Sequence, residues 1–242
     1  MKITQFKTYI MRGIARNWLF VKIETDEGLH GWGEGTLEGQ EKTVEQAIHM
    51  LAPRLVGQDP TAIEKHWQVL YRHGFWRGGV VLNSAISAID QALWDIAGKA
   101  LGVPVYKLLG GPVRDRIRAY SHANDPEGAK KLVKMGFTGI KAGGWYTNEN
   151  IDERLIPQKL REKVQAIREA VGPDVDIMID NHGRSRPAVA IRQIAAVEDL
   201  GLLFFEEPVP PDNLDALAQV RQAGFKTDLA TGERLFTRWG FK

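Results

Sequence analysis

The first 34 residues alternate apolar and polar side chains in the manner of antiparallel strands. Residues 18–25 lead into the turn Asp26-Glu-Gly28, and residues 29–34 run back along them. A short, glycine-containing connection between two such runs is typical of a β-hairpin. This part of the chain is therefore predicted to be an antiparallel meander.

Helical spacing replaces this alternation further along the chain. Three helices are predicted, at residues 41–56, 60–71 and 84–101. One side of the third carries a row of apolar residues: Ile86, Ile89, Leu93, Ile96 and Ala97. Gly102 and Pro104 follow it directly and are expected to end it. Strands followed by helices predict an α+β domain over residues 1–115.

After Arg116 short apolar runs alternate with amphipathic segments. The predicted strands are residues 117–122, 138–142, 175–181, 202–208 and 228–232. The helices between them are predicted at residues 126–135, 154–171, 187–200 and 212–223. Repeated strand–helix units with nearly continuous apolar strands indicate a parallel α/β sheet over residues 116–242. The inner strand faces are expected to carry Ile140, Ile177, Ile179, Leu203 and Phe205.

The alternation of strands and helices alone is compatible with both a doubly wound sheet and a barrel. The absence of a Gly-x-Gly-x-x-Gly motif after the first of these strands disfavours a dinucleotide-binding fold.

Composition excludes several classes of protein. The 242 residues carry 32 basic and 30 acidic side chains, so no basic field is available for nucleic acid or for a membrane surface. No apolar run approaches the ~18–20 residues of a membrane span, and the N-terminus lacks the apolar core of a secretory signal. The sequence has no cysteine, which excludes disulfides and thiolate metal sites. A cytoplasmic protein is the expectation.

Three acids follow three consecutive predicted strands. Asp180, Glu206 and Glu233 are 26 and 27 residues apart, about one strand–helix unit each. Each should therefore lie at the carboxyl end of its strand, where parallel barrels build their active sites. Three neighbouring carboxylates repel one another unless a cation neutralises them, and an all-oxygen ligand set suits Mg²⁺. The alternative for each acid is an ordinary solvated loop residue.

Two neighbours of these acids are further candidates. Glu207 alternates away from Glu206 in an extended chain, so we expect it to support the site or to form a salt bridge. His182 follows Asp180 by two residues, which places both side chains on one side of the strand. Its imidazole could transfer a proton, ligate the metal or simply form a hydrogen bond, and we favour proton transfer.

Four other residues are weaker candidates for contacting a substrate. Lys141 ends the second strand of the sheet and could hold a substrate carboxylate, pair with the acids or be solvated. Arg184 could pair with a substrate or with Glu207. His122, after the first strand, could face the same cavity, and Trp76 belongs to an irregular segment in the first domain.

Two of these features resemble a known family. Residues 85–99, continuing through 104–110, are similar to the N-terminal signature of the mandelate racemase/muconate lactonizing enzyme branch of the enolase superfamily. The acids Asp180, Glu206 and Glu233, with Pro208 and Gly232 beside them, resemble its metal-ligand set. The resemblance covers the whole chain. It implies a capping α+β domain before a (β/α) barrel, Mg²⁺ as cofactor, and specificity loops at residues 12–18 and 37–40.

Further details resemble the galactonate dehydratase group of that branch. The motifs that carry this resemblance are residues 28–34, 71–79, 180–184 and 232–238. Racemase-type relatives have Lys-x-Lys at the end of the second barrel strand, and this sequence has Gly143 in place of the second lysine. The resemblance implies β-elimination of water from a galactonate-like acid sugar through an enediolate. In this reaction His182 would protonate the departing 3-hydroxyl, and a histidine from a later strand would be the base.

The sequence ends at Lys242, soon after the fifth predicted strand of the barrel. We therefore expect about five barrel strands, and a fragment, truncated reading frame or degenerate protein that is inactive by itself. The complete protein is expected to be a homo-oligomer that acts on a small acid sugar. Two alternatives stay open: another enolase-superfamily lyase or isomerase with a different carboxylate substrate, and a non-catalytic, metal-binding relative.

Overall fold

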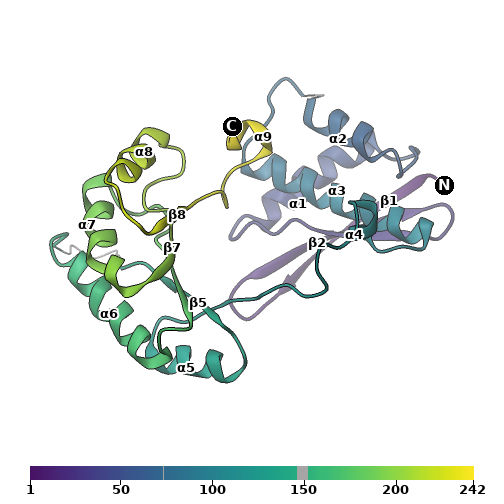
Figure 1. Cartoon of the computed structure of the whole chain (residues 1–242). Helices are drawn as coiled ribbons and strands as arrows, with labels where there is room; N and C mark the ends of the chain where they lie inside the picture. The colour runs from purple at the N-terminus through teal and green to yellow at the C-terminus, as the bar shows by residue number, and fades with distance from the viewer. Residues whose placement is uncertain (73, 146–151) are drawn as a thin grey trace. The chain divides into compact units, whose positions relative to one another are not determined.

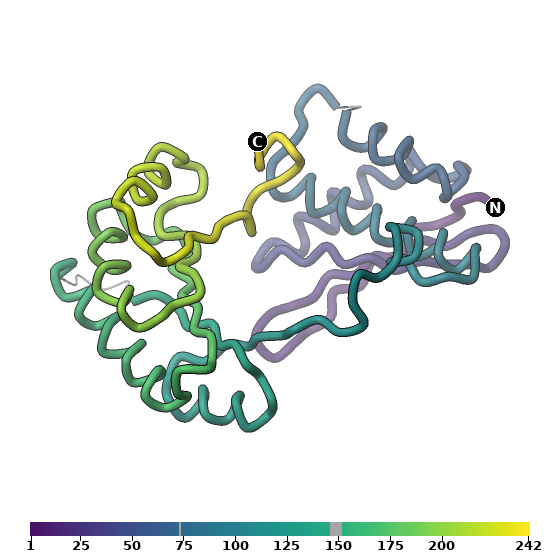
Figure 2. The backbone as a smooth tube through the Cα atoms, viewed as in Figure 1, coloured from purple at the N-terminus to yellow at the C-terminus, as the bar shows by residue number. Residues whose placement is uncertain are grey.

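A computed structural model describes residues 1–72, 74–145 and 152–242 (Figure 1). The chain divides into two compact units, Met1–Asp115 and Arg116–Lys242. Figure 2 follows the backbone through each unit in turn. No helix in the described ranges is long and apolar enough to cross a membrane.

The N-terminal unit begins with the expected meander. Its described strands are β1 (Ile3–Arg12), β2 (Asn17–Thr25) and β3 (His30–Glu34), which pair antiparallel in chain order. At the predicted turn, the Thr25 amide donates to the Leu29 carbonyl over 3.0 Å, and Gly28 adopts a φ of 83°. Glycine adopts this left-handed conformation at little cost, which explains its place in the turn.

Helices follow the meander, as the spacing predicts. They are α1 (Glu41–Leu51), a short 3₁₀ turn (Ala52–Arg54), α2 (Ile63–Arg72), α3 (Val80–Leu101) and α4 (Val105–Leu108). The predicted apolar row of α3 is buried along its whole length. Strand β3 packs against α3 backbone to backbone. A Cβ on Gly33 of β3 would lie only 1.9 Å from the carbonyl oxygen of Ala88 in α3. Only glycine allows this close approach.

The C-terminal unit is a parallel sheet flanked by helices. Its described strands are β4 (Ser121–His122), β5 (Gly139–Gly143), β6 (Asp176–Asp180), β7 (Leu202–Glu206) and β8 (Asp228–Ala230). The helices are α5 (Pro126–Lys134), α6 (Ile156–Val171), α7 (Pro187–Val197), α8 (Leu214–Gln222) and α9 (Thr237–Phe241), with a 3₁₀ turn at Glu198–Leu200. The strands follow one another in chain order, β4 to β8. A doubly wound sheet reverses its strand order, so this order favours the barrel.

Helices α5 to α8 line one side of the sheet in Figure 1. Our assignment of the inner strand face was wrong. Ile140, Ile177, Ile179 and Phe205 are buried in one cluster with residues of the flanking helices, such as Leu160 and Ile194. Since side chains alternate along a strand, the opposite face carries Lys141, Met178, Asp180, Phe204 and Glu206.

Leu203 is 45% exposed rather than buried. The register between β6 and β7 shifts at this point, from Ile177 opposite Leu202 to Met178 opposite Phe204, so Leu203 has no partner in the ladder. A residue at such a β-bulge leaves the regular alternation of the strand.

The carboxyl ends of the neighbouring strands lie side by side at the position where the sequence places the acids. Asp180 pairs with Gly143 on one side and with Glu206 on the other, and Glu206 pairs with Ala230. The last residues of four neighbouring strands, β5 to β8, therefore meet at one edge of the sheet.

Candidate metal centre

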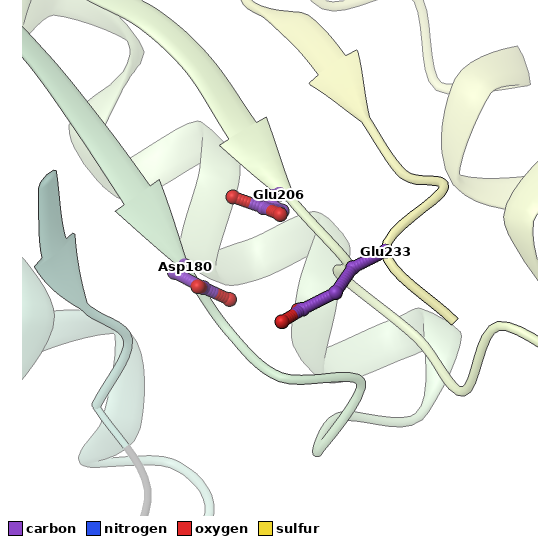
Figure 3. A group of neighbouring side chains, drawn as sticks. All are labelled: Asp180, Glu206 and Glu233. Carbon is purple, nitrogen blue, oxygen red and sulfur yellow. The ribbon is translucent and has the colours of Figure 1, made fainter. Parts of the chain in front are cut away.

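Three carboxylates converge at this edge. Asp180 is the last residue of β6, Glu206 is the last residue of β7, and Glu233 follows β8. One carboxylate oxygen from each lies within 4.8 Å of those of the other two, and the three side chains point toward one another in Figure 3. The predicted meeting of these acids is therefore what the structure contains.

Glu233 reaches the group from a loop and not from a strand end. We predicted a strand to residue 232, but β8 ends at Ala230. The backbone between β8 and Glu233 turns at Gly232, where φ is 126°. This conformation strongly favours glycine, and the ring of Phe241 already lies 3.2 Å from where a Cβ would be.

The group has the chemistry and spacing of a magnesium site. Ligand bonds of ~2.1 Å in an octahedron place ligand oxygens roughly 3–4 Å apart. Oxygens that lie within 4.8 Å of one another reach this spacing with small side-chain rotations. Asp180 is buried, Glu206 is partly buried and Glu233 is exposed, so one side of the group remains open to solvent and substrate. The residues present fit a bound Mg²⁺ with room for other oxygen ligands.

Lys141 is the cation of this group. Its Nζ lies 3.0 Å from Asp180 Oδ2 and 2.8 Å from Glu206 Oε2. Burial alone would lower the pKa of Lys141, but the hydrogen bonds to Glu206 and Asp180 outweigh it and the pKa is raised. Of the three options that the sequence left open, pairing with the acids is the one that the structure contains.

We predict that Lys141→Met strengthens Mg²⁺ binding. A lysine charge next to two ligand carboxylates opposes a second cation there, and unit charges ~4 Å apart interact by about 4 kcal/mol at an effective dielectric near 20. Tenfold tighter binding, about 1.4 kcal/mol, is a conservative expectation for calorimetric titration.

The matched control for this change is Lys163→Met. Lys163 binds Asn124 and the carbonyl of Gly143 at the end of β5, but these partners are neutral. Its substitution should leave Mg²⁺ affinity unchanged. Weaker binding in Lys141→Met would mean that the lysine organises the ligands instead of opposing the metal.

His182 lies beside the carboxylates. Its Nε2 is 3.4 Å from Asp180 Oδ2, its backbone amide donates to Asp180 Oδ1 over 3.2 Å, and half of its side chain is exposed. The imidazole is not part of the convergent oxygen group. This position suits proton transfer to a substrate bound at the open side, which stays a prediction.

The other candidates differ in their surroundings. His122 ends β4 opposite Lys141. Burial and the Lys141 charge lower the pKa of His122, whereas Asp180 and Glu206 act in the opposite direction, so His122 is within electrostatic reach of the acids. Trp76 belongs to the N-terminal unit, where it is 86% exposed and meets Phe75 edge to face. Its role in substrate binding remains an expectation.

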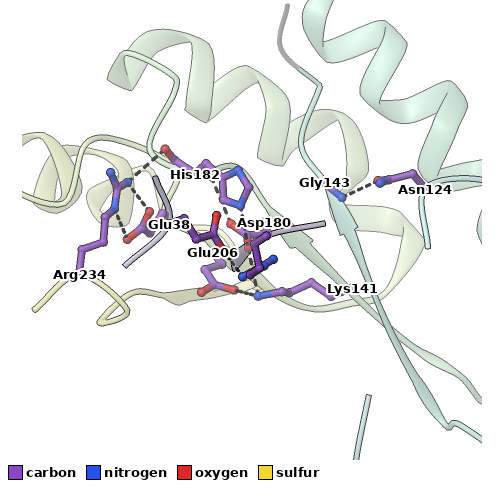
Figure 4. Close-up of polar contacts among 10 residues, drawn as sticks. Glu38, Asn124, Lys141, Gly143, Asp180, His182, Glu206 and Arg234 are labelled. Atoms are coloured by element: carbon purple, nitrogen blue, oxygen red, sulfur yellow. Dashed lines mark hydrogen bonds and ion pairs between the residues drawn. The ribbon is translucent and has the colours of Figure 1, made fainter. Parts of the chain in front are cut away.

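Glu207 is buried, as a supporting residue should be, and its carboxylate is paired with Arg234. Figure 4 shows Arg234 with His182 and Lys141 nearby. The partner expected from the sequence was Arg184, whereas Arg234 was not among the candidates. This pairing could have been predicted from the sequence. A buried acid needs a cation, and Arg234 directly follows a proposed metal ligand.

Comparison with known proteins agrees with this architecture. Residues 9–110 match the mandelate racemase / muconate lactonizing enzyme N-terminal domain, and residues 125–242 match the enolase C-terminal domain-like family. The chain belongs to the mandelate racemase/muconate lactonizing enzyme family of the enolase superfamily.

Within this family the chain is similar to D-galactonate dehydratases. It is 46% identical to those of Pectobacterium atrosepticum and Verminephrobacter eiseniae over 248 residues. The alignments cover 100% of this chain and 64% of each relative, so the chain spans somewhat less than two thirds of their length.

Solved structures of the same fold include both dehydratase-type proteins and a cycloisomerase. An enolase from Agrobacterium radiobacter, described as a putative galactarate dehydratase and solved with Na and L-malate, matches with a TM-score of 0.92 at 34% identity, over 100% of this chain and 63% of that one. The 3,6-anhydro-D-galactonate cycloisomerase from Zobellia galactanivorans matches with a TM-score of 0.89 at 32% identity, over 100% and 68%. The fold alone therefore does not choose the reaction.

Proposed function

We propose that this chain supplies the capping domain and the metal-binding part of a Mg²⁺-dependent acid-sugar dehydratase, with galactonate or a close relative as substrate. The convergence of Asp180, Glu206 and Glu233 within 4.8 Å is the observation that carries the proposal. The similarity to D-galactonate dehydratases across the whole chain supports the choice of substrate. The metal and substrate roles of individual residues belong to this proposal.

The hard step is removal of a proton from the carbon next to the substrate carboxylate. Negative charge then accumulates on the carboxylate oxygens, and a bound Mg²⁺ supplies the positive charge that stabilises it. Asp180, Glu206 and Glu233 would hold the metal at the open side of the group. His182, beside Asp180, would protonate the hydroxyl that leaves from the next carbon.

Gly143 supports dehydration over racemisation. A second lysine at the end of β5 is absent, because the position has no side chain, and an Asn124 oxygen already lies 3.4 Å from where a Cβ would be. Within the described residues, His182 is therefore the candidate acid on this side of the group. The second candidate function, an isomerase of the same family, is favoured by the similarity to the Zobellia cycloisomerase.

A screen of acid sugars with the full-length protein tests the proposal. We expect galactonate with Mg²⁺ to yield a 2-keto-3-deoxy acid, and we expect EDTA to abolish the reaction. The product is identified by NMR, which distinguishes a keto acid from a racemised or cyclised substrate. A purified, folded protein that binds Mg²⁺ but leaves every acid sugar unchanged would reject the dehydratase.

We further propose that a polypeptide restricted to residues 1–242 has little turnover. Strands β4 and β8 are the unpaired edges of the described sheet, and Asp180 and Glu206 lie on the internal strands β6 and β7 between them. By family resemblance the second proton-transfer residue would come from a later strand. We also propose a cytoplasmic, homo-oligomeric protein, which cell fractionation and sedimentation can test.

A further inference from the structure

Two residues beside the proposed ligands have an unusual backbone. His182 has a φ of 52° and Glu207 has a φ of 40°. Residues other than glycine keep such left-handed conformations only where their surroundings hold them. His182 lies two residues after Asp180, and Glu207 directly follows Glu206. The chain thus turns directly after each of these two proposed ligands, and neighbouring groups must hold both turns in place.

Backbone hydrogen bonds continue the strand pairing into both turns. The Asn181 amide donates to the Glu206 carbonyl over 3.0 Å, and the Gly183 amide donates to the Glu207 carbonyl over 2.8 Å. The Glu207 amide in turn donates to the Ala230 carbonyl over 2.9 Å. The turns after β6, β7 and β8 are thus connected along one edge.

Arg234 joins the same three turns through its side chain. Its Nε donates to Glu207 Oε1 over 3.1 Å, its Nη2 forms an ion pair with Glu207 Oε2, and Nη2 also donates to the His182 carbonyl over 3.1 Å (Figure 4). Glu207 is only 2% exposed, so its charge depends on this partner. The guanidinium also lies over Gly183, where a Cβ would be 2.7 Å from Nη2.

We propose that Arg234 is a positioning residue: through Glu207 and the His182 carbonyl it fixes Asp180, Glu206 and Glu233 in the geometry that binds the metal. The inference rests on the metal site of the proposed function. Arg234 is attached to all three ligands by short stretches of chain, since it adjoins Glu233 and contacts the residues that follow the other two. Partners of this kind change metal affinity by about 10–100-fold when they are removed.

Electrostatics alone predicts the opposite effect, which makes the proposal testable. Arg234 is a cation near the site, so its removal should strengthen Mg²⁺ binding if only its charge matters. If it positions the ligands, its removal should weaken binding. Arg234→Lys separates the two contributions, because it keeps the charge but cannot reach Glu207 and His182 with a planar fork.

Arg168 offers a matched control within the same unit. It donates to the carbonyl oxygens of Leu200 and Gly201 before β7, and to those of Gly172 and Val175 before β6. These contacts lie at the amino ends of the strands, away from the acids. Arg168→Met should lower the melting temperature and leave Mg²⁺ affinity unchanged.

The experiment is calorimetric titration of the full-length protein with MgCl₂, with melting temperatures measured without metal. We expect Arg234→Met to raise the Kd about 10–100-fold and Arg234→Lys to give an intermediate value. An unchanged or lower Kd in Arg234→Met, or an equal loss of affinity in Arg168→Met, would overturn the proposal. If Arg234→Met does not fold, the Kd of Arg234→Lys decides, and wild-type affinity there contradicts positioning.

The outcomes separate this inference from the proposed function. A wild-type protein that binds Mg²⁺ without dehydrating acid sugars would reject the dehydratase and still test Arg234. A wild-type Kd in the Arg234 variants of an active dehydratase would reject only the positioning role. A wild-type protein that binds no Mg²⁺ would reject both.

Discussion

Asp180→Asn is expected to abolish Mg²⁺ binding at millimolar metal and to reduce turnover to background. Asp180 is the buried member of the three convergent acids, and its carboxylate is paired with Lys141. Removal of a partner of a metal ligand already costs about 10–100-fold in affinity, so loss of a charged ligand should cost more than 100-fold. Titration calorimetry gives the Kd directly.

Thermal unfolding provides a second measurement of the same change. A ligand at 100 times its Kd stabilises the folded protein by about 2.7 kcal/mol, so Mg²⁺ should raise the melting temperature of the wild type but not of Asp180→Asn. Asp176→Asn is the control, because Asp176 begins the same strand and pairs with Arg118 at the opposite end. Tight Mg²⁺ binding by Asp180→Asn would remove this residue from the site.

His182→Asn is expected to lower turnover by about 10²–10⁴, the usual contribution of a general acid or base. Asparagine is a suitable replacement, because it tolerates the left-handed backbone that His182 adopts at φ 52°. Mg²⁺ affinity should survive, since the imidazole lies outside the convergent oxygens. Steady-state kinetics with galactonate measures the loss, and it should appear in kcat more than in KM.

His49→Asn is the control for His182→Asn. His49 is on α1 in the N-terminal unit, where its ring contacts the Thr8 hydroxyl, and its substitution should leave turnover unchanged. Normal turnover in His182→Asn would exclude the acid role. Loss of Mg²⁺ binding instead would make His182 a ligand or a support of one.

The sequence predicted the features that depend on periodicity and strand order. Helix α3 and its apolar row followed from spacing, because burial of one helix face requires it. The convergence of the acids followed from their separation of one strand–helix unit and from the level carboxyl ends of parallel strands. Boundaries were less accurate, and β4 is only Ser121–His122 where a longer strand was expected.

Tertiary contacts explain what the sequence did not predict. The inner and outer strand faces were exchanged because near-continuous apolar runs carry no alternation from which to choose a face. The parity of Asp180 in β6 would have resolved this, since residues two positions apart share a face. The pairing of Lys141 with two acids, and of Arg234 with Glu207, joins residues that are distant in the sequence.

The most direct test of the metal centre is an anomalous diffraction measurement on crystals of the full-length protein grown with Mn²⁺, which carboxylates bind in place of Mg²⁺. We predict a single strong peak bonded to one oxygen each of Asp180, Glu206 and Glu233, at about 2.0–2.2 Å. His182 and Lys141 should lie outside its ligand shell. A metal-saturated crystal with no peak among these three carboxylates, or with its peak elsewhere, would contradict the account.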